Sequence, residues 1–132
     1  MNSETKNFVF VRANHRCEYC QLPASNSPLT PFHVEHVRAK QHRGDDEVSN
    51  LCLSCAQCNY YKGPNQSAFD PLTDTLVRLF NPRVDDWGVH FHWEAAILVG
   101  NTPEGRATVE LLQINEPSRH ELRQLLLEDG DL

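Results

Sequence analysis

The chain has 132 residues and a mass of 15.1 kDa, a size that suits one compact domain. No apolar run approaches the roughly 20 residues that a membrane helix needs, and the first residues lack the order of a secretory signal, so we expect a cytoplasmic protein without a membrane partner. The net charge of −6 is unevenly spread: residues 1–66 hold seven Lys/Arg and six Asp/Glu, whereas residues 67–132 hold five and twelve. A nucleic-acid surface is therefore expected in the N-terminal half, with weak non-specific affinity for DNA.

The first half of the chain predicts short elements separated by loops. A helix or an extended arm is expected over residues 5–14, and a short strand over residues 32–37. Residues 21–31 and 41–50 are rich in turn-forming residues and predict loops. Residues 58–62 are expected to begin a helix that ends by the Gly-Pro pair that follows, a common helix stop.

The second half predicts three strands. Alternation of apolar and polar residues indicates strands over residues 75–80, 89–93 and 96–99. Within the second of these, His90 and His92 are expected to form a polar face, because alternate residues of a strand point to the same side.

Two helices are predicted after these strands. Thr102 and Pro103 are a typical N-cap and first residue for a helix that runs to about residue 112. Pro117 opens a last helix, whose expected apolar stripe consists of Leu122, Leu125 and Leu126. No catalytic constellation is recognisable in this half, which we interpret as packing and scaffold.

Five cysteines lie within the first 58 residues, and their close pairs indicate a metal site rather than disulfides. Cys17 and Cys20 form one CxxC pair, but the second pair is ambiguous, because Cys52, Cys55 and Cys58 are each three residues apart. We favour Cys55 and Cys58, which leaves Cys52 as a small buried thiol. Four thiolates make a closed, structural zinc site with no open position for substrate, and a redox pair is the alternative.

The segment from Cys20 to Asn59 contains groups suited to metal-assisted phosphodiester hydrolysis, which needs a base for the attacking water and a cation on the phosphate. Glu35 and Asn59 offer oxygen ligands for Mg²⁺ or Mn²⁺. His36 is a candidate general base, because imidazole can take up a proton near neutral pH. Adjacent strand side chains point to opposite faces, so Glu35 and His36 can serve one site only where the strand bends or ends.

Several short motifs follow one another in a fixed order: Cys17-x-x-Cys20, Val34-Glu35-His36-Val37, Gly44, Ser49-Asn50-Leu51 and Cys55-x-x-Cys58-Asn59-x-x-Lys62-Gly63. This succession resembles the zinc-bearing branch of the HNH endonuclease family and covers residues 12–64, nearly half of the chain. The resemblance implies a small α+β fold. Residues 1–66 would form a ββα-metal core with its zinc, and residues 67–132 an α/β extension packed on that core within a single structural domain.

The resemblance also implies a role for each matching residue. His36 matches the base that deprotonates the attacking water, and Glu35 and Asn59 match the ligands of the catalytic metal. Asn50 matches the asparagine that bonds to loop backbone and holds the strand of the base in place. Lys62 would lie near the phosphate, with a helix C-terminal cation as its alternative role. Such sites leave a 5′-phosphate and a 3′-hydroxyl.

The chain departs from the family pattern in three places. Glu35 stands where Asp or His is more frequent, Asn59 replaces the last histidine of the family name, and the proline usual after the base is absent. Three basic residues after the base, namely Arg38, Lys40 and Arg43, are candidates for phosphate contacts, with a solvated loop surface as the alternative.

The predicted function is metal-dependent cleavage of DNA by an endonuclease, and RNA is an open alternative substrate. Because the acidic second half weakens the grip on nucleic acid, a homodimer or a protein partner is also expected. The alternative functions are a zinc-stabilised nucleic-acid-binding module and a protein-interaction module, both without catalysis. The presence of the whole predicted catalytic set favours the enzyme.

Overall fold

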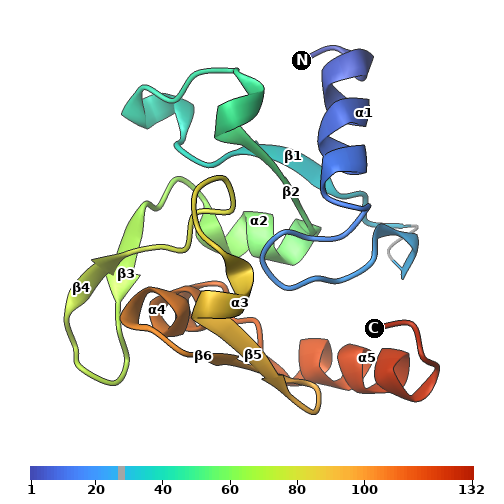
Figure 1. Ribbon diagram of the computed structural model, residues 1–132, viewed down its shortest axis with the longest axis vertical. Helices are drawn as coiled ribbons and strands as arrows, with labels where there is room; N and C mark the ends of the chain where they lie inside the picture. Colours follow the sequence, from blue (N-terminus) through green and yellow to red (C-terminus); the bar gives the residue numbers. More distant parts are fainter. Residues whose placement is uncertain (27–28) are drawn as a thin grey trace.

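The computed structural model describes residues 1–26 and 29–132 and has a small α+β fold (Figure 1). Its first half contains helix α1 (Ser3–Arg12), strands β1 (His33–His36) and β2 (Leu51–Ser54), and helix α2 (Ala56–Lys62). Its second half contains strands β3 (Ser67–Phe69) and β4 (Leu76–Arg78), the short helix α3 (Trp87–His90), strands β5 (Phe91–Glu94) and β6 (Ile97–Gly100), and helices α4 (Pro103–Leu111) and α5 (Pro117–Glu128). Within the described ranges, no helix has the length and apolar character to span a bilayer.

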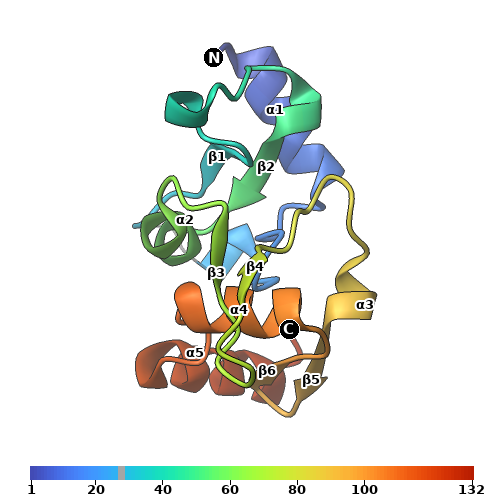
Figure 2. The same cartoon turned by 90° about the vertical axis from the view of Figure 1, so that its left-hand side faces the viewer.

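In the described part of the chain, the strands form three separate antiparallel hairpins, which follow one another along the long axis of the molecule (Figures 1 and 2). Helix α1 packs on β1 and β2 at one end. Helix α4 contacts β3, β4 and β6 and so joins the two C-terminal hairpins. Helix α2 lies between these ends and contacts β1, which places it beside the hairpin that carries the predicted base.

Two groups of buried side chains hold these elements together. The larger group surrounds the cysteines and draws on both halves of the chain, with Tyr19 from the first half and Phe80, Phe91 and Leu112 from the second. Aromatic rings of this size bury much apolar surface, and Tyr19 meets Phe80 edge to face with 6.3 Å between ring centroids. The acidic second half is therefore packed directly on the cysteine-bearing segments.

Local capping explains where several predicted helices begin. The side chain of Asn2 accepts the Thr5 amide at 2.8 Å, so the helix predicted over residues 5–14 starts earlier, at Ser3, and it ends at Arg12. Thr102 accepts the Gly105 amide at 3.0 Å and begins α4 as expected. The predicted loop 21–31 contains a short 3₁₀ turn, Ala24–Asn26, and two of its residues, 27 and 28, lie outside the described part of the chain.

The strand predicted over residues 89–93 is wrong at its start. Asp86 accepts the Gly88 amide at 3.1 Å and begins one helical turn, α3, so β5 starts only at Phe91. His90 is consequently buried and bonds to the Thr102 hydroxyl at 2.6 Å. It does not form a polar strand face with His92.

The apolar stripe predicted for the last helix is also wrong. Leu126 is buried, but Leu122 and Leu125 remain 38% and 54% exposed. The buried face of α5 instead carries Arg119 and Arg123, because both guanidinium groups find acceptors inside the protein. A leucine count alone cannot reveal such a face.

Candidate active site and zinc site

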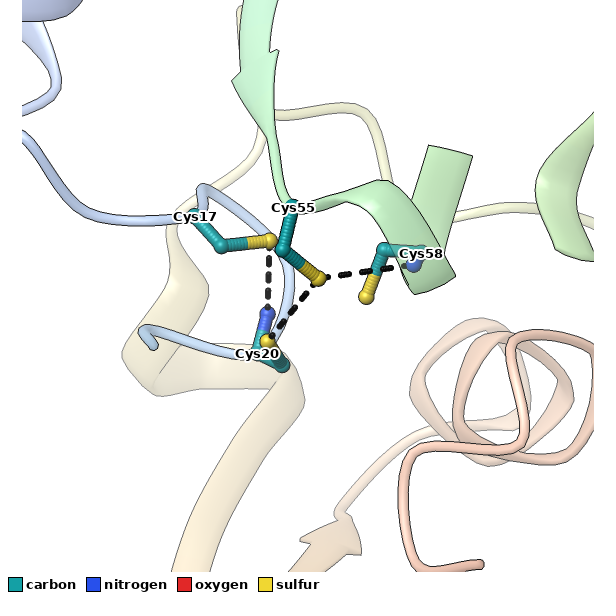
Figure 3. A group of neighbouring side chains, drawn as sticks. All are labelled: Cys17, Cys20, Cys55 and Cys58. Atoms are coloured by element: carbon teal, nitrogen blue, oxygen red, sulfur yellow. Dashed lines mark hydrogen bonds between the residues drawn. The ribbon is translucent and has the colours of Figure 1, made fainter. Parts of the chain in front are cut away.

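The four cysteines chosen from the two CxxC pairs come together in space. The Sγ atoms of Cys17, Cys20, Cys55 and Cys58 all lie within 4.8 Å of one another and are buried (Figure 3). A tetrahedral zinc ion with Zn–S bonds of about 2.3 Å requires sulfur atoms about 3.8 Å apart. The Sγ atoms of Cys20 and Cys55 are 3.7 Å apart, so this cluster fits a structural zinc ion.

Two tight turns present these sulfur atoms. The Cys20 amide donates to Cys17 Sγ at 3.5 Å in the loop after α1. The Cys58 amide donates to Cys55 Sγ at 3.4 Å, and Cys55 thereby caps the N-terminus of α2 (Figure 3). Backbone amides that point at sulfur favour its ionised form, which is the form that binds zinc. This cap also explains why α2 begins at Ala56 rather than near Cys58.

A buried arginine from the far end of the chain completes the cysteine cluster. Arg119 Nη2 donates to Cys58 Sγ at 3.0 Å, and lies 3.8 Å from Cys55 Sγ. Burial by itself would lower the pKa of Arg119, but the neighbouring thiolates of Cys58 and Cys20 outweigh it and raise that pKa above its ordinary value. Zinc with four thiolates carries a net charge of −2, and the guanidinium offsets part of it.

The β1–β2 hairpin and α2 together form the predicted catalytic region. In the hairpin, Glu35 is paired with Cys52 and His36 with Leu51. Helix α2 follows directly after β2 and Cys55, and it brings Asn59 to the same region. The elements therefore occur in the order strand, strand, helix.

Glu35, His36 and Asn59 line one open cavity of about 310 Å³. His36 is the last residue of β1, so the strand ends there, and the adjacent side chains of Glu35 and His36 both line the cavity. His33 and Lys40 also line it. Two oxygen-bearing side chains and one imidazole are thus placed together, and this donor set fits a hard divalent cation beside a base.

Glu35 is the most enclosed of these groups, with 7% of its surface exposed. Burial raises the pKa of its carboxyl group, although the positive charge of Lys62 and hydrogen bonds from Tyr19 and Cys52 oppose the rise. The Cys52 thiol donates to Glu35 Oε1 at 3.3 Å. Cys52 is therefore a buried thiol outside the zinc cluster, and it supports the carboxylate.

Asn50 ties together the two ends of the loop between β1 and β2. Its Oδ1 accepts the Arg38 amide at 2.9 Å, and its Nδ2 donates to the carbonyl groups of Arg38 at 3.0 Å and Asp45 at 2.9 Å. Gly44 lies close to these hydrogen bonds, where a Cβ atom would stand only 1.7 Å from the carbonyl oxygen of Arg38. The loop after the base is consequently held in one conformation.

Lys62 does not face the cavity as a phosphate-binding residue would. It is 2% exposed, and its Nζ donates to the Val37 carbonyl at 3.1 Å. Gln66 Nε2 donates to the same carbonyl at 2.9 Å. The substrate-binding role expected for Lys62 is therefore corrected to a structural one: it holds the end of α2 against the strand of the base.

The three basic loop residues stay at the surface. Arg38, Lys40 and Arg43 are all exposed. Arg38 Nε donates to the His42 carbonyl at 2.6 Å, and Lys40 Nζ lies 3.2 Å from Asp46 Oδ1. Lys40 lines the cavity, so it is the one of the three that lies directly beside the predicted catalytic groups.

Two residues of these sites are absent from the sequence prediction. Asp46 bonds to His36, with its Oδ1 atom 2.7 Å from His36 Nε2. Arg119 bonds to the cysteine cluster from α5. For Asp46, the run of acidic residues at 45–47 is a signal in the sequence, but spacing does not choose among these three residues. For Arg119, nothing in the neighbouring sequence links it to cysteines about 60 positions away.

Comparisons with known proteins agree with this geometry. The model of the family described as HNH endonuclease matches residues 17–65. This part of the chain, which holds the four clustered cysteines, is therefore similar to an HNH endonuclease domain. The chain is also 29% identical over 109 residues to the Septu protein PtuB of Bacillus thuringiensis, an alignment that covers 81% of this chain and 39% of that protein.

The chain thus spans about two fifths of the length of this relative. No solved structure matches the chain. Endonucleases, the enzyme class named in the description of the matched family, act on nucleic acid. The HNH match begins at the first zinc-site cysteine and ends after α2, so it contains every residue that lines the cavity.

Proposed function

We propose that this HNH protein is a metal-dependent endonuclease that hydrolyses phosphodiester bonds of DNA. The observation that carries the proposal is the placement of Glu35, His36 and Asn59 around one open cavity. An imidazole and two oxygen-bearing side chains, from β1 and α2, line this cavity within the segment that matches the HNH family, and they support the roles of base and metal ligands.

Each of these side chains has a role in the proposed reaction. Glu35 and Asn59 would hold Mg²⁺ or Mn²⁺, which when bound supplies positive charge to the scissile phosphate and the leaving oxygen. His36 takes a proton from the attacking water as the water oxygen bonds to phosphorus. The bond from phosphorus to the 3′ oxygen breaks, and that oxygen takes a proton from solvent, which leaves a 5′-phosphate and a 3′-hydroxyl.

The surface around the cavity supports binding of a phosphate backbone. Arg38, Lys40 and Arg43 are exposed on the loop beside His36 and would contact phosphates on either side of the scissile bond. The seven Asp/Glu in excess over Lys/Arg in residues 67–132 would repel the same backbone. We therefore propose that the protein grips DNA as a homodimer or with a protein partner. Light scattering after gel filtration that shows a monomer cutting efficiently at physiological salt would refute this part.

The test is cleavage of supercoiled plasmid by the purified protein with EDTA, Mg²⁺ or Mn²⁺. Wild-type protein should relax or linearise the plasmid only with a divalent ion, and His36→Ala and Asn59→Ala should abolish cutting. His92→Ala is the matched control, because this histidine is exposed on β5 in the other half of the chain. Cutting that persists in His36→Ala at the wild-type rate would refute the assignment of the base.

The same assay decides between the substrate classes and the non-catalytic alternatives. A single-stranded RNA of matched length, assayed in parallel, should be cut more slowly than DNA if the proposal is right. Retarded migration of DNA without cutting under any metal would instead indicate a zinc-stabilised binding module. Neither cutting nor retardation of DNA or RNA would indicate a protein-interaction module.

A further inference from the structure

A carboxylate of the loop between β1 and β2 stands directly against the predicted base. Asp46 Oδ1 lies 2.7 Å from His36 Nε2, a short hydrogen bond between a carboxylate and an imidazole. The His36 side chain is 22% exposed, whereas that of Asp46 is 64% exposed. The carboxylate is therefore much more exposed to solvent than the ring that it contacts.

We propose that Asp46 is a positioning residue for His36: its carboxylate accepts the Nε2–H and thereby leaves Nδ1 as the ring nitrogen that takes the proton from water. The proposal rests on the nuclease function proposed above, since it concerns the base of that reaction. A histidine base must present one particular nitrogen, and the group bonded to the other nitrogen decides which one it is.

The loop is built to keep Asp46 in this place. Asn50 binds the carbonyl group of Asp45, the residue directly before Asp46, at 2.9 Å. Lys40 Nζ approaches the same Asp46 Oδ1 atom at 3.2 Å. Because Asn50 also bonds to the backbone of Arg38, the end of the base strand and the acidic loop are fixed relative to each other. The asparagine thus positions His36 partly through the carboxylate.

The charge of Asp46 suits this role during proton transfer. Hydrogen bonds from His36 and Lys40 lower the pKa of the Asp46 carboxyl, so it stays ionised at neutral pH. When water gives its proton to Nδ1, the ring becomes an imidazolium, and the negative carboxylate at Nε2 faces that new positive charge. The proton stays on the ring, and Asp46 itself is not protonated.

The opposite role for Asp46 would be inhibition, by blocking access to His36 and Lys40. If the ion pair of Asp46 with His36 and Lys40 only covered the site, its removal would free both side chains and raise the cleavage rate. The two roles therefore predict opposite changes in kcat for the same substitution, and one set of variants separates them.

The experiment compares Asp46→Ala, Asp46→Asn and the matched control Glu47→Ala in the zinc-bound protein. Glu47 is exposed in the same loop, and its substitution removes the same charge without touching His36. Asp46→Ala should lower kcat by about 10- to 100-fold with little change in KM, a size typical for groups that orient a first ligand or base. Asp46→Asn should recover part of the loss, because its amide oxygen can accept the Nε2–H. Glu47→Ala should cut at a rate close to that of the wild type.

A second measurement keeps the positioning role testable apart from activity. Long-range ¹H–¹⁵N spectra of the imidazole groups should show His36 as the Nε2–H tautomer in wild type and in Glu47→Ala, and as a mixture in Asp46→Ala. Equal kcat for Asp46→Ala and Glu47→Ala, or an unchanged tautomer in Asp46→Ala, would overturn the proposal. If wild-type protein cuts nothing, the proposed function fails, while the spectra still decide whether Asp46 orients His36.

Discussion

Arg119 connects the last helix to the zinc site, and its replacement by methionine would measure how strongly the two halves of the chain depend on each other. The guanidinium donates to Cys58 Sγ at 3.0 Å and to the Leu112 carbonyl at 2.6 Å, and the residue is 6% exposed. Methionine keeps most of the aliphatic volume but leaves a buried thiolate and a carbonyl without their donor. Breaking a buried charged pair of this kind costs about 3–5 kcal/mol of unfolding free energy.

The assay for Arg119→Met combines urea unfolding with zinc competition by a chelator. Because the guanidinium offsets the negative charge of the zinc-bound thiolates, zinc affinity should also fall by about 10- to 100-fold. Arg123→Met is the matched control: Arg123 is also buried on α5, but its hydrogen bonds go to the Ala96 carbonyl at 3.1 Å and Asn115 Oδ1 at 3.0 Å. Arg123→Met should lower the free energy of unfolding, but it should reduce zinc affinity less than Arg119→Met does. Equal zinc loss in the two variants, or an Arg119→Met protein within about 1 kcal/mol of wild type, would refute the reasoning.

Three further outcomes follow from the same contacts. Asp70 is buried and its oxygens accept Arg106 Nε and Nη2 at 2.9 and 2.8 Å, which holds the pKa of that carboxyl well below its ordinary value of 3.8. The stability that the ionised Asp70 contributes is therefore complete above about pH 3.8 and is lost as the pH falls below that value. Asp70→Asn should flatten the acid side of a plot of Tm against pH, and an unchanged slope would contradict this. Lys62→Met should lower the free energy of unfolding by about 1–3 kcal/mol with no change in the KM for DNA. Arg43→Ala should raise that KM and leave Tm unchanged. The reverse pattern would restore the phosphate-binding role of Lys62. Removal of zinc, by a strong chelator or by Cys58→Ser, should lower Tm and abolish DNA cutting together, and full activity in a zinc-free protein would show that the cysteine cluster is not needed to build the site.

The parts of the fold that the sequence predicted are those fixed by short-range spacing. A CxxC pair places two sulfur atoms on one side of a tight turn, so Cys17 with Cys20 is recognisable as a ligand pair in the sequence itself. Spacing left Cys52 as an alternative member of the second pair, and the fold decides for Cys55 and Cys58, because the Cys52 thiol bonds to Glu35 outside the cluster. Helix starts marked by a capping side chain, such as Thr102, were also predictable.

The errors arise where a distant residue changes the meaning of a local pattern. Arg119 and Arg123 are buried on α5 because acceptors from other segments reach them, and the leucines beside them are left at the surface. In the same way, Lys62 has the position of a helix C-terminal cation, but its stem turns inward and its ammonium group meets the Val37 carbonyl. Burial of a charged side chain depends on its partners, and those partners are not visible in a window of ten residues.

The zinc cluster and the cavity share the same elements, which gives the structural ion a mechanical role in the proposed chemistry. Cys55 follows β2 without a gap and caps α2, and Cys58 is directly followed by Asn59 on that helix. Glu35 comes from the paired strand β1, whose register with β2 places Glu35 opposite Cys52. A hairpin of four-residue strands and a helix of seven residues are each too short to hold a geometry alone. Four sulfur atoms bound to one ion would fix the start of α2, and with it the end of β2, against the loop that holds Cys17 and Cys20, and the separation between Glu35 and Asn59 would follow from that junction.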